Sequence, residues 1–172
     1  MKLHQLLATV VGLTGVVGIA SADTKDVEKP FRVQVGSFMP SKAALKSAVG
    51  KNWTSFGVAY ELQKKKGVEK PLIYGVYVDY ATKKKGGVSN NLTGIGAQAR
   101  YLLGSPSDHD HAYVVGGVGS YTFKRTGSSY KSKIGFKVGG GYEMNNGFFG
   151  EVTAVSPGNN ANGINASVGF RF

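Results

Sequence analysis

The sequence predicts an all-β fold, in which eight antiparallel strands follow one another in an up-and-down meander and close into a transmembrane β-barrel preceded by a signal peptide. Three observations lead to this prediction. Apolar and polar residues alternate with a period of two along eight separate runs. One face of these runs is bulky and apolar, whereas the other is small or polar. The first residues have the pattern of a secretion signal.

The N-terminal segment contains the three parts of a secretory signal peptide. A weakly basic head, residues 1–5, precedes an apolar stretch from residue 6 to 19, and Ala20-Ser21-Ala22 supplies the small residues of a cleavage site. The apolar stretch is shorter than the roughly 20 residues that a spanning helix needs. We therefore expect residues 1–22 to be a cleaved signal peptide, 23–30 a short N-terminal segment, and 31–172 the barrel.

The alternating runs are separated by segments rich in turn-forming residues. An even number of antiparallel strands with short links predicts a meander, and closing the sheet removes both exposed edges. Residues 41–48 look helical, although the sequence leaves open whether this helix forms. The expected strands are 31–39, 53–63, 72–81, 92–103, 112–124, 133–144, 148–156 and 163–172.

One hairpin allows a register to be predicted. If Asn145, Asn146 and Gly147 form a three-residue loop with Gly147 in the left-handed conformation, Tyr142 pairs with Gly150 and the apolar faces of the two strands match.

The strand at 112–124 has no assigned register, because two sets of residues compete for its apolar face. A bulge at the glycine pair 116–117 would switch its faces. The competing sets are Tyr113, Val115, Tyr121 and Phe123 against Val114 and Val118.

Side-chain volume decides which face of the barrel points outward. The interior of an eight-stranded barrel is just wide enough for side chains to fill, so it cannot hold all the large residues and leave glycine outside. The large apolar residues must face outward, where lipid surrounds them. Tyrosines near strand ends are expected at the headgroup level. The outward set includes Val33, Val35, Phe56, Val58, Leu62, Tyr74, Val76, Ile95, Phe136, Val138 and Val152, and the tyrosine girdle is Tyr60, Tyr80, Tyr101, Tyr121 and Tyr142.

The same alternation places charged residues in the lumen. Glu143 and Glu151 are a possible acid/base pair, but nearby arginines would keep both ionised and a filled lumen admits no substrate. The expected inward set is Arg32, Glu61, Asp79, Arg100, Lys133, Lys137, Glu143, Glu151 and Arg171. Six of these fall toward the barrel end where the first strand begins, and they predict a balanced ion-pair network: Arg32, Glu61, Arg100, Glu143, Glu151 and Arg171.

Few residues suggest catalytic or metal chemistry. Asp108, His109, Asp110 and His111 form a metal-like cluster, but neighbouring residues point to opposite sides, so they are weak candidates and a solvated turn is expected. The chain has no cysteine, and no glycine-rich phosphate loop precedes a helix. We expect no cofactor and no enzymatic activity.

Lysine runs at 64–66 and 83–85 follow the second and third strands and should lie at opposite rims. We expect them to keep turns solvated, and the alternative is that the outer run meets anionic lipid headgroups. The formal net charge of +11 suits such contacts. Nucleic-acid binding is not expected, because the charges flank the barrel instead of forming one face with interleaved aromatics.

The final run, Gly163 to Phe172, alternates without a break and ends on an aromatic residue. Here the chain resembles the small eight-stranded bacterial outer-membrane barrels of the OmpA and OmpX type. The resemblance implies an insertion signal at Val168, Phe170 and Phe172 that the barrel-insertion machinery reads.

The resemblance also implies the kind of protein to expect. It implies a monomeric, non-enzymatic envelope component in the outer membrane, surrounded by its lipids and without a large pore. Two alternatives remain: a soluble secreted or periplasmic barrel that binds an apolar ligand, and a membrane-barrel lipid-modifying enzyme.

Overall fold

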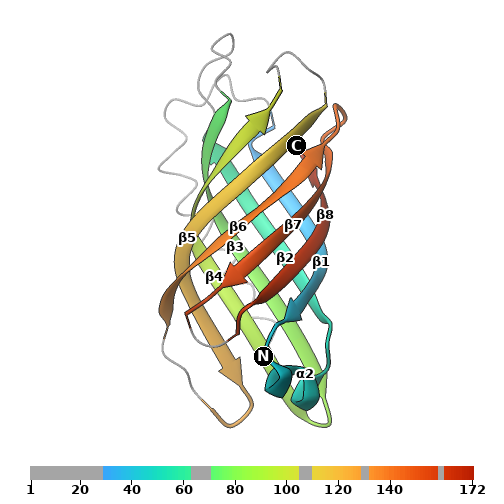
Figure 1. Ribbon diagram of the computed structural model, residues 1–172, viewed down its shortest axis with the longest axis vertical. Coiled ribbons are helices and arrows are strands. Elements are labelled where there is room, and N and C mark those ends of the chain that lie inside the picture. The colour runs from blue at the N-terminus through green and yellow to red at the C-terminus, as the bar shows by residue number, and fades with distance from the viewer. Residues whose placement is uncertain (1–28, 63–70, 105–109, 129–131, 159–160) are drawn as a thin grey trace.

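The computed structural model describes residues 29–62, 71–104, 110–128, 132–158 and 161–172. Its strands form one closed barrel in sequence order, and every neighbouring pair is antiparallel (Figure 1). The expected eight-stranded antiparallel barrel is therefore confirmed. The expected signal peptide at 1–22 and nearly all of the segment 23–30 lie outside the described residues.

The strand bounds agree with the expected runs to within a few residues except in one hairpin. A short helix, α2 (Ala43–Val49), connects the first two strands. Within the described part of the chain, no helix is both long and apolar enough to cross a membrane. The strands are β1 (Phe31–Pro40), β2 (Trp53–Leu62), β3 (Leu72–Lys85), β4 (Val88–Leu103), β5 (His111–Arg125), β6 (Lys133–Glu143), β7 (Phe148–Ser156) and β8 (Gly163–Arg171).

The β3–β4 hairpin is longer than predicted. Residues 82–91 were expected to form a turn, but β3 continues to Lys85 and β4 begins at Val88. Gly86 and Gly87 have φ angles of 57° and 78°. A two-residue hairpin turn of type I′ has positive φ at both central positions, which a glycine pair provides. The lysine run therefore belongs to a strand, and the tight turn lies in the two glycines that follow it.

Strand β5 is regular throughout. Its pairing with β4 and β6 passes through Gly116 and Gly117 without a bulge. Tyr113 and Tyr121 point into the lumen and are buried, whereas Val114 is exposed. The place given to Tyr121 in the outward girdle is therefore wrong. Its ring fits inside because glycine, at position 94, lies directly opposite on β4.

The β6–β7 hairpin has the predicted register. Tyr142 pairs with Gly150, and Gly147 adopts a φ of 91°. The Met144 N–H donates to the Phe148 carbonyl at 2.8 Å, closing the loop.

The two faces of the barrel differ as their side-chain volumes predict. Large apolar residues are exposed on the outside; Phe136, for example, is 57% exposed and Ile134 is 74% exposed. The inward face carries glycine, charged and aromatic residues. Lys133 was expected inside, but it is exposed, because it is the first residue of β6 and lies at the rim.

The barrel has two distinct ends. The C-terminus lies at one end, and α2 lies at the other (Figure 1). We call them the Phe172 end and the α2 end. The β1–β8 pairing closes the barrel from Arg32–Arg171 to Pro40–Gly163.

A pair of glycines on adjacent strands tests this face assignment. A methyl group at inward Gly139 would overlap the backbone of β7, with its Cβ 2.7 Å from Thr153 Cα, whereas one at outward Gly150 would meet nothing within 4 Å. Gly139→Ala should lower the free energy of unfolding by about 1–3 kcal/mol. Gly150→Ala should leave it unchanged or raise it by up to about 1 kcal/mol. Denaturant unfolding in lipid vesicles measures both, and equal losses would contradict the assignment.

Candidate functional site

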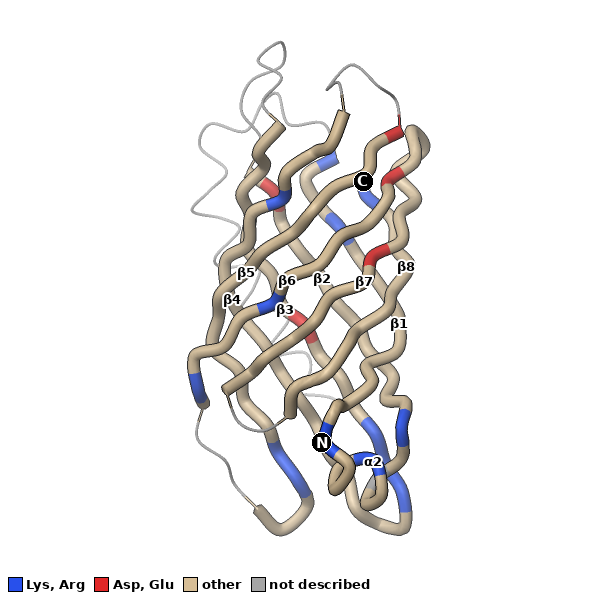
Figure 2. The backbone as a smooth tube through the Cα atoms, viewed as in Figure 1, with Lys and Arg blue, Asp and Glu red and all other residues tan. Residues whose placement is uncertain are grey.

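The candidate site is the lumen at the Phe172 end, where the structure brings together the six charged residues singled out in the sequence. They come from β1, β2, β4, β6, β7 and β8 and meet across the bore. Figure 2 shows that the acidic residues lie in this half and in the middle of the barrel. We call Arg32, Glu61, Arg100, Glu143, Glu151 and Arg171 the lumen network.

Arg100 is the centre of the lumen network and is 1% exposed. Its Nε and Nη2 donate to the two carboxylate oxygens of Glu61, each at 2.8 Å. Its Nη1 donates to Glu143 Oε2, also at 2.8 Å. The planar guanidinium thus joins β2, β4 and β6, strands that are not neighbours in the sheet. A two-point arginine–carboxylate contact fixes geometry as well as charge.

Arg32 lies deeper in the lumen and is held by aromatic residues as well as acids. Its Nη1 lies 3.5 Å from Glu151 and 3.7 Å from Glu61. Its Nη2 donates to the Tyr113 hydroxyl at 2.7 Å, and its guanidinium lies 3.8 Å from the centre of the Phe149 ring. Cation–π contact of this kind stabilises a desolvated guanidinium.

Arg171 completes the network near the rim. Its Nη1 donates to Glu143 Oε1 at 3.1 Å, and its Nε lies 3.4 Å from Glu61 Oε2. The same Nε donates to the carbonyl of Lys29 at 2.8 Å. Three arginines therefore face three glutamates, and the network is balanced in charge.

Sequence reasoning missed the aromatic part of this site. Tyr113 donates to Glu151 at 3.1 Å, and its ring lies 4.7 Å from the Arg100 guanidinium. Its inward position could have been read from the alternation of β5, but the competing set of valines left that register open.

The middle of the lumen holds a second ion pair. Lys137 Nζ donates to Asp79 at 2.9 Å and lies 3.6 Å from the centre of the Tyr77 ring. The hydroxyls of Tyr77 and Tyr121 are hydrogen-bonded at 2.8 Å. Both charged residues were expected inside, and they bridge β3 and β6 across the bore.

The α2 half of the lumen is mainly apolar. Trp53 is 0% exposed, its ring stacks on Phe123 with centroids 6.2 Å apart, and its Nε1 donates to the Gly50 carbonyl at 3.3 Å. Leu45 of α2 packs against the apolar cluster that contains Trp53 and Phe123. The helix therefore helps to close this end.

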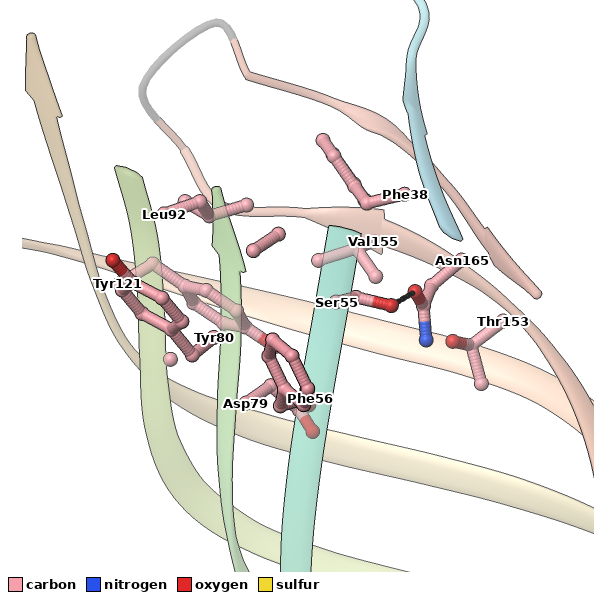
Figure 3. Close-up of a pocket in the computed structure, with 12 residues that line it drawn as sticks. Phe38, Ser55, Phe56, Asp79, Tyr80, Leu92, Tyr121, Thr153, Val155 and Asn165 are labelled. Carbon is pink, nitrogen blue, oxygen red and sulfur yellow. Dashed lines mark hydrogen bonds between the residues drawn. The ribbon is translucent and has the colours of Figure 1, made fainter. Parts of the chain in front are cut away.

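The cavities among these side chains are small. One of about 30 Å³ lies near Phe38, Tyr121 and Val155, beside the hydrogen bond of 2.7 Å from the Ser55 hydroxyl to Asn165 (Figure 3). Another of about 10 Å³ lies beside Asp79 and Lys137. A cavity needs about 10–15 Å³ to hold a single water molecule. These cavities are therefore large enough for one or two waters and too small for an organic substrate.

Of the remaining candidates, His111 pairs with Glu143 of the lumen network in the β5–β6 register, and the others are not part of the network. Asp108 and His109 lie outside the described residues. Asp110 accepts from the Asn145 N–H at 2.8 Å and from the Tyr142 hydroxyl at 3.3 Å. Within the described ranges, no group of three or more histidine or acidic side chains is arranged to hold a metal ion.

The C-terminal residues lie on the outer face. Val168, Phe170 and Phe172 are all exposed. Phe172 exchanges two backbone hydrogen bonds with Phe31, and their rings stack with centroids 6.0 Å apart. Phe172 therefore packs across the closure seam, and its reading by insertion machinery stays a prediction.

Removing one member of the network tests its balance. Glu61→Ala would leave three arginines, two of them buried, facing two glutamates, and should lower the free energy of unfolding by about 3–5 kcal/mol. The double variant Glu61→Met with Arg100→Met restores equal numbers and should recover most of this loss. Denaturant unfolding in lipid vesicles compares them. A Glu61→Ala protein as stable as the parent would contradict a tightly coupled network.

The comparisons with known proteins bear on the fold. No protein-family model matches the chain, and no curated protein matches it significantly. The solved structure of Neisserial surface protein A is similar with a TM-score of 0.67 and 15% identity, over 82% of this chain and 94% of that one. The outer-membrane enzyme PagL is similar with a TM-score of 0.52 and 12% identity, over 82% and 98%. This chain therefore has the fold of small eight-stranded outer-membrane barrels.

Proposed function

We propose that the protein is a non-enzymatic component of the bacterial outer membrane, a monomeric barrel whose lumen is filled by its own side chains. The observation that carries this proposal is the contrast between the two faces of the sheet. The outside exposes a continuous series of large apolar residues, including Phe56, Tyr74, Ile95 and Phe136, while the charged residues are buried inside. Water would penalise that distribution, whereas a bilayer stabilises it.

Closure of the sheet supports the membrane location and the monomeric state. Each strand is hydrogen-bonded on both sides, so the barrel presents no open edge to lipid or to another chain. The outward apolar positions occur on every strand from β1 to β8. The alternative of a soluble barrel around an apolar ligand fits poorly, because the lumen is occupied by side chains and its polar half is charged.

The contacts of the buried carboxylates support a non-enzymatic role. Glu61, Glu143 and Glu151 are each within 4 Å of arginine nitrogens, so their oxygens contact the protein's own side chains and are not free to contact a substrate. Among the described residues, no hydrogen bond joins a serine hydroxyl to His111. PagL has the same fold and is an enzyme, so lipid modification stays the alternative that the experiment must test.

Membrane fractionation and conductance test the proposal together. The mature protein should sediment with outer membranes and resist carbonate extraction. In planar bilayers it should give no large steady conductance, because side chains fill the narrow bore. Lipid A extracted from expressing cells should have an unchanged mass. Recovery as a soluble periplasmic monomer would contradict the membrane location. Stable porin-sized channels would contradict the filled lumen. A change in the mass of lipid A would show that the protein is a lipid-modifying enzyme.

A further inference from the structure

The charged residues are segregated along the barrel axis. Every described acidic residue belongs to the Phe172 half or to the middle of the barrel. The described charged residues at the α2 end are all basic (Figure 2). Among the described residues, none of these cations at the α2 end forms an ion pair with an acid. We call this set the basic rim: Lys42, Lys46, Lys51, Lys83, Lys84, Lys85, Lys124, Arg125 and Lys133.

Four members of the basic rim belong to the inward face by their register, Lys83, Lys85, Arg125 and Lys133, and two of them flank one residue of β4. Asn90 on β4 pairs directly with Lys83 on β3 and with Arg125 on β5. Residues directly opposite in antiparallel strands point to the same face with Cβ atoms about 4.5–5.5 Å apart. One step deeper, Leu92 pairs with Ala81 and with Phe123 in the apolar cluster. Lys83, Asn90 and Arg125 therefore form the outermost inward row that spans all three strands, and only the pair Lys85–Val88 on β3 and β4 lies further out.

Asn90 has unmet hydrogen-bonding capacity. Its side chain is 0% exposed, yet neither its Nδ2 nor its Oδ1 has a hydrogen-bond partner. Buried amides are almost always hydrogen-bonded, so an orphaned one indicates that a partner such as water or an ion belongs beside it. Two uncompensated cations flank this amide, and an anion that accepts hydrogen bonds would satisfy its Nδ2 and match both cations, while its Oδ1 needs a donor such as water.

We propose that the α2 end binds the phosphate group of an anionic lipid, and that the row Lys83, Asn90 and Arg125 is its central contact. The Asn90 amide donates to a phosphate oxygen, while Lys83 and Arg125 neutralise the charge. Arginine and lysine bind phosphate as a planar donor and a point charge respectively. The inference rests on the proposed function, because it requires the barrel to lie in a bilayer.

The position of the row favours a lipid over a free anion. The exposed apolar face reaches the α2 end, where Ile134 follows Lys133 and Met39 precedes Pro40. The basic rim begins where this apolar face ends. In a bilayer, that boundary lies at the level of the lipid headgroups. Basic residues near an anionic membrane surface each contribute about 1 kcal/mol of attraction, so a lipid phosphate gains both from the row and from its neighbours.

The chain contains its own reporter for this experiment. Trp53 is the single tryptophan of the sequence. It stacks on Phe123, two residues before Arg125 on the same strand. The full-length mature protein in zwitterionic micelles can therefore be titrated with short-chain phosphatidic acid while tryptophan fluorescence is recorded. Parallel titrations use phosphatidylcholine and a fatty acid of equal chain length, and inorganic phosphate.

The expected result is saturable binding of phosphatidic acid, with weaker binding of the other three compounds. The double variant Lys83→Gln with Arg125→Gln should weaken the binding of phosphatidic acid about 25-fold. Each basic residue contributes about 1 kcal/mol, which is about fivefold in affinity. The control Lys29→Gln removes one positive charge from an exposed residue at the Phe172 end. It should change the affinity for phosphatidic acid less than twofold. Asn90→Leu keeps every charge and should reduce the preference for phosphatidic acid over the fatty acid.

A single-atom change gives the sharpest test. Asn90→Asp places a carboxylate between Lys83 and Arg125, so the protein then supplies the missing anion itself. We expect this variant to unfold at a higher temperature than the parent and to bind phosphatidic acid at least tenfold more weakly. A lower unfolding temperature, or unchanged binding, would overturn the proposed row.

The remaining outcomes separate the possible failures. Equal binding of the fatty acid would show general electrostatic attraction, and tighter binding of inorganic phosphate would show a different ligand; each overturns the proposal. A membrane-inserted protein that ignores phosphatidic acid contradicts this inference alone. A protein that does not enter bilayers contradicts the proposed function itself.

Discussion

The narrow bore of an eight-stranded barrel is the constraint on which the rest of this structure depends. The interior has room for a limited volume of side chains, so large residues can enter only where glycine or another small residue lies beside them. Tyr121 is inside because residue 94 is glycine, and Tyr113 because residue 141 is glycine. The large apolar residues that find no such space lie outside, which leaves them exposed around the whole barrel and requires lipid.

The same constraint makes charge balance in the lumen important. Arg100 is almost completely buried and crosses the bore to reach Glu61 and Glu143, so an unmatched charge there would have no water to solvate it. The α2 half is filled by the cluster around Trp53 and covered by Leu45. The two halves exclude solvent in different ways, one by ion pairs and one by apolar packing. Among the described residues, the cations without an ion pair gather at the α2 rim, apart from Lys29 at the Phe172 end, and an external anion can reach them there.

Much of the fold and of the site could be predicted from the sequence, because strand alternation is a local signal and face assignment follows from volume. Inward alternation alone placed the six charged residues of the lumen network. Arg100 as their centre could not be predicted, since that depends on how strands separated in the sheet face each other across the bore. The turn between β3 and β4 was predicted too long, because a run of three lysines is typical of a loop. The glycine pair that follows the lysines forms the turn itself. The orphaned amide of Asn90 has no sequence signal, since its surroundings depend on how β3, β4 and β5 pair.

The claim that the bulky face contacts lipid is tested most directly by scanning β3 with spin labels. The chain has no cysteine, so single cysteines at successive positions from 72 to 80 can each be labelled in vesicles. Accessibility to dissolved oxygen, which concentrates in lipid, should be high at Tyr74, Val76 and Val78. It should be low at Gly75 and Tyr77, giving a period of two. The reverse pattern, or a uniform accessibility to water-soluble nickel complexes, would contradict the account.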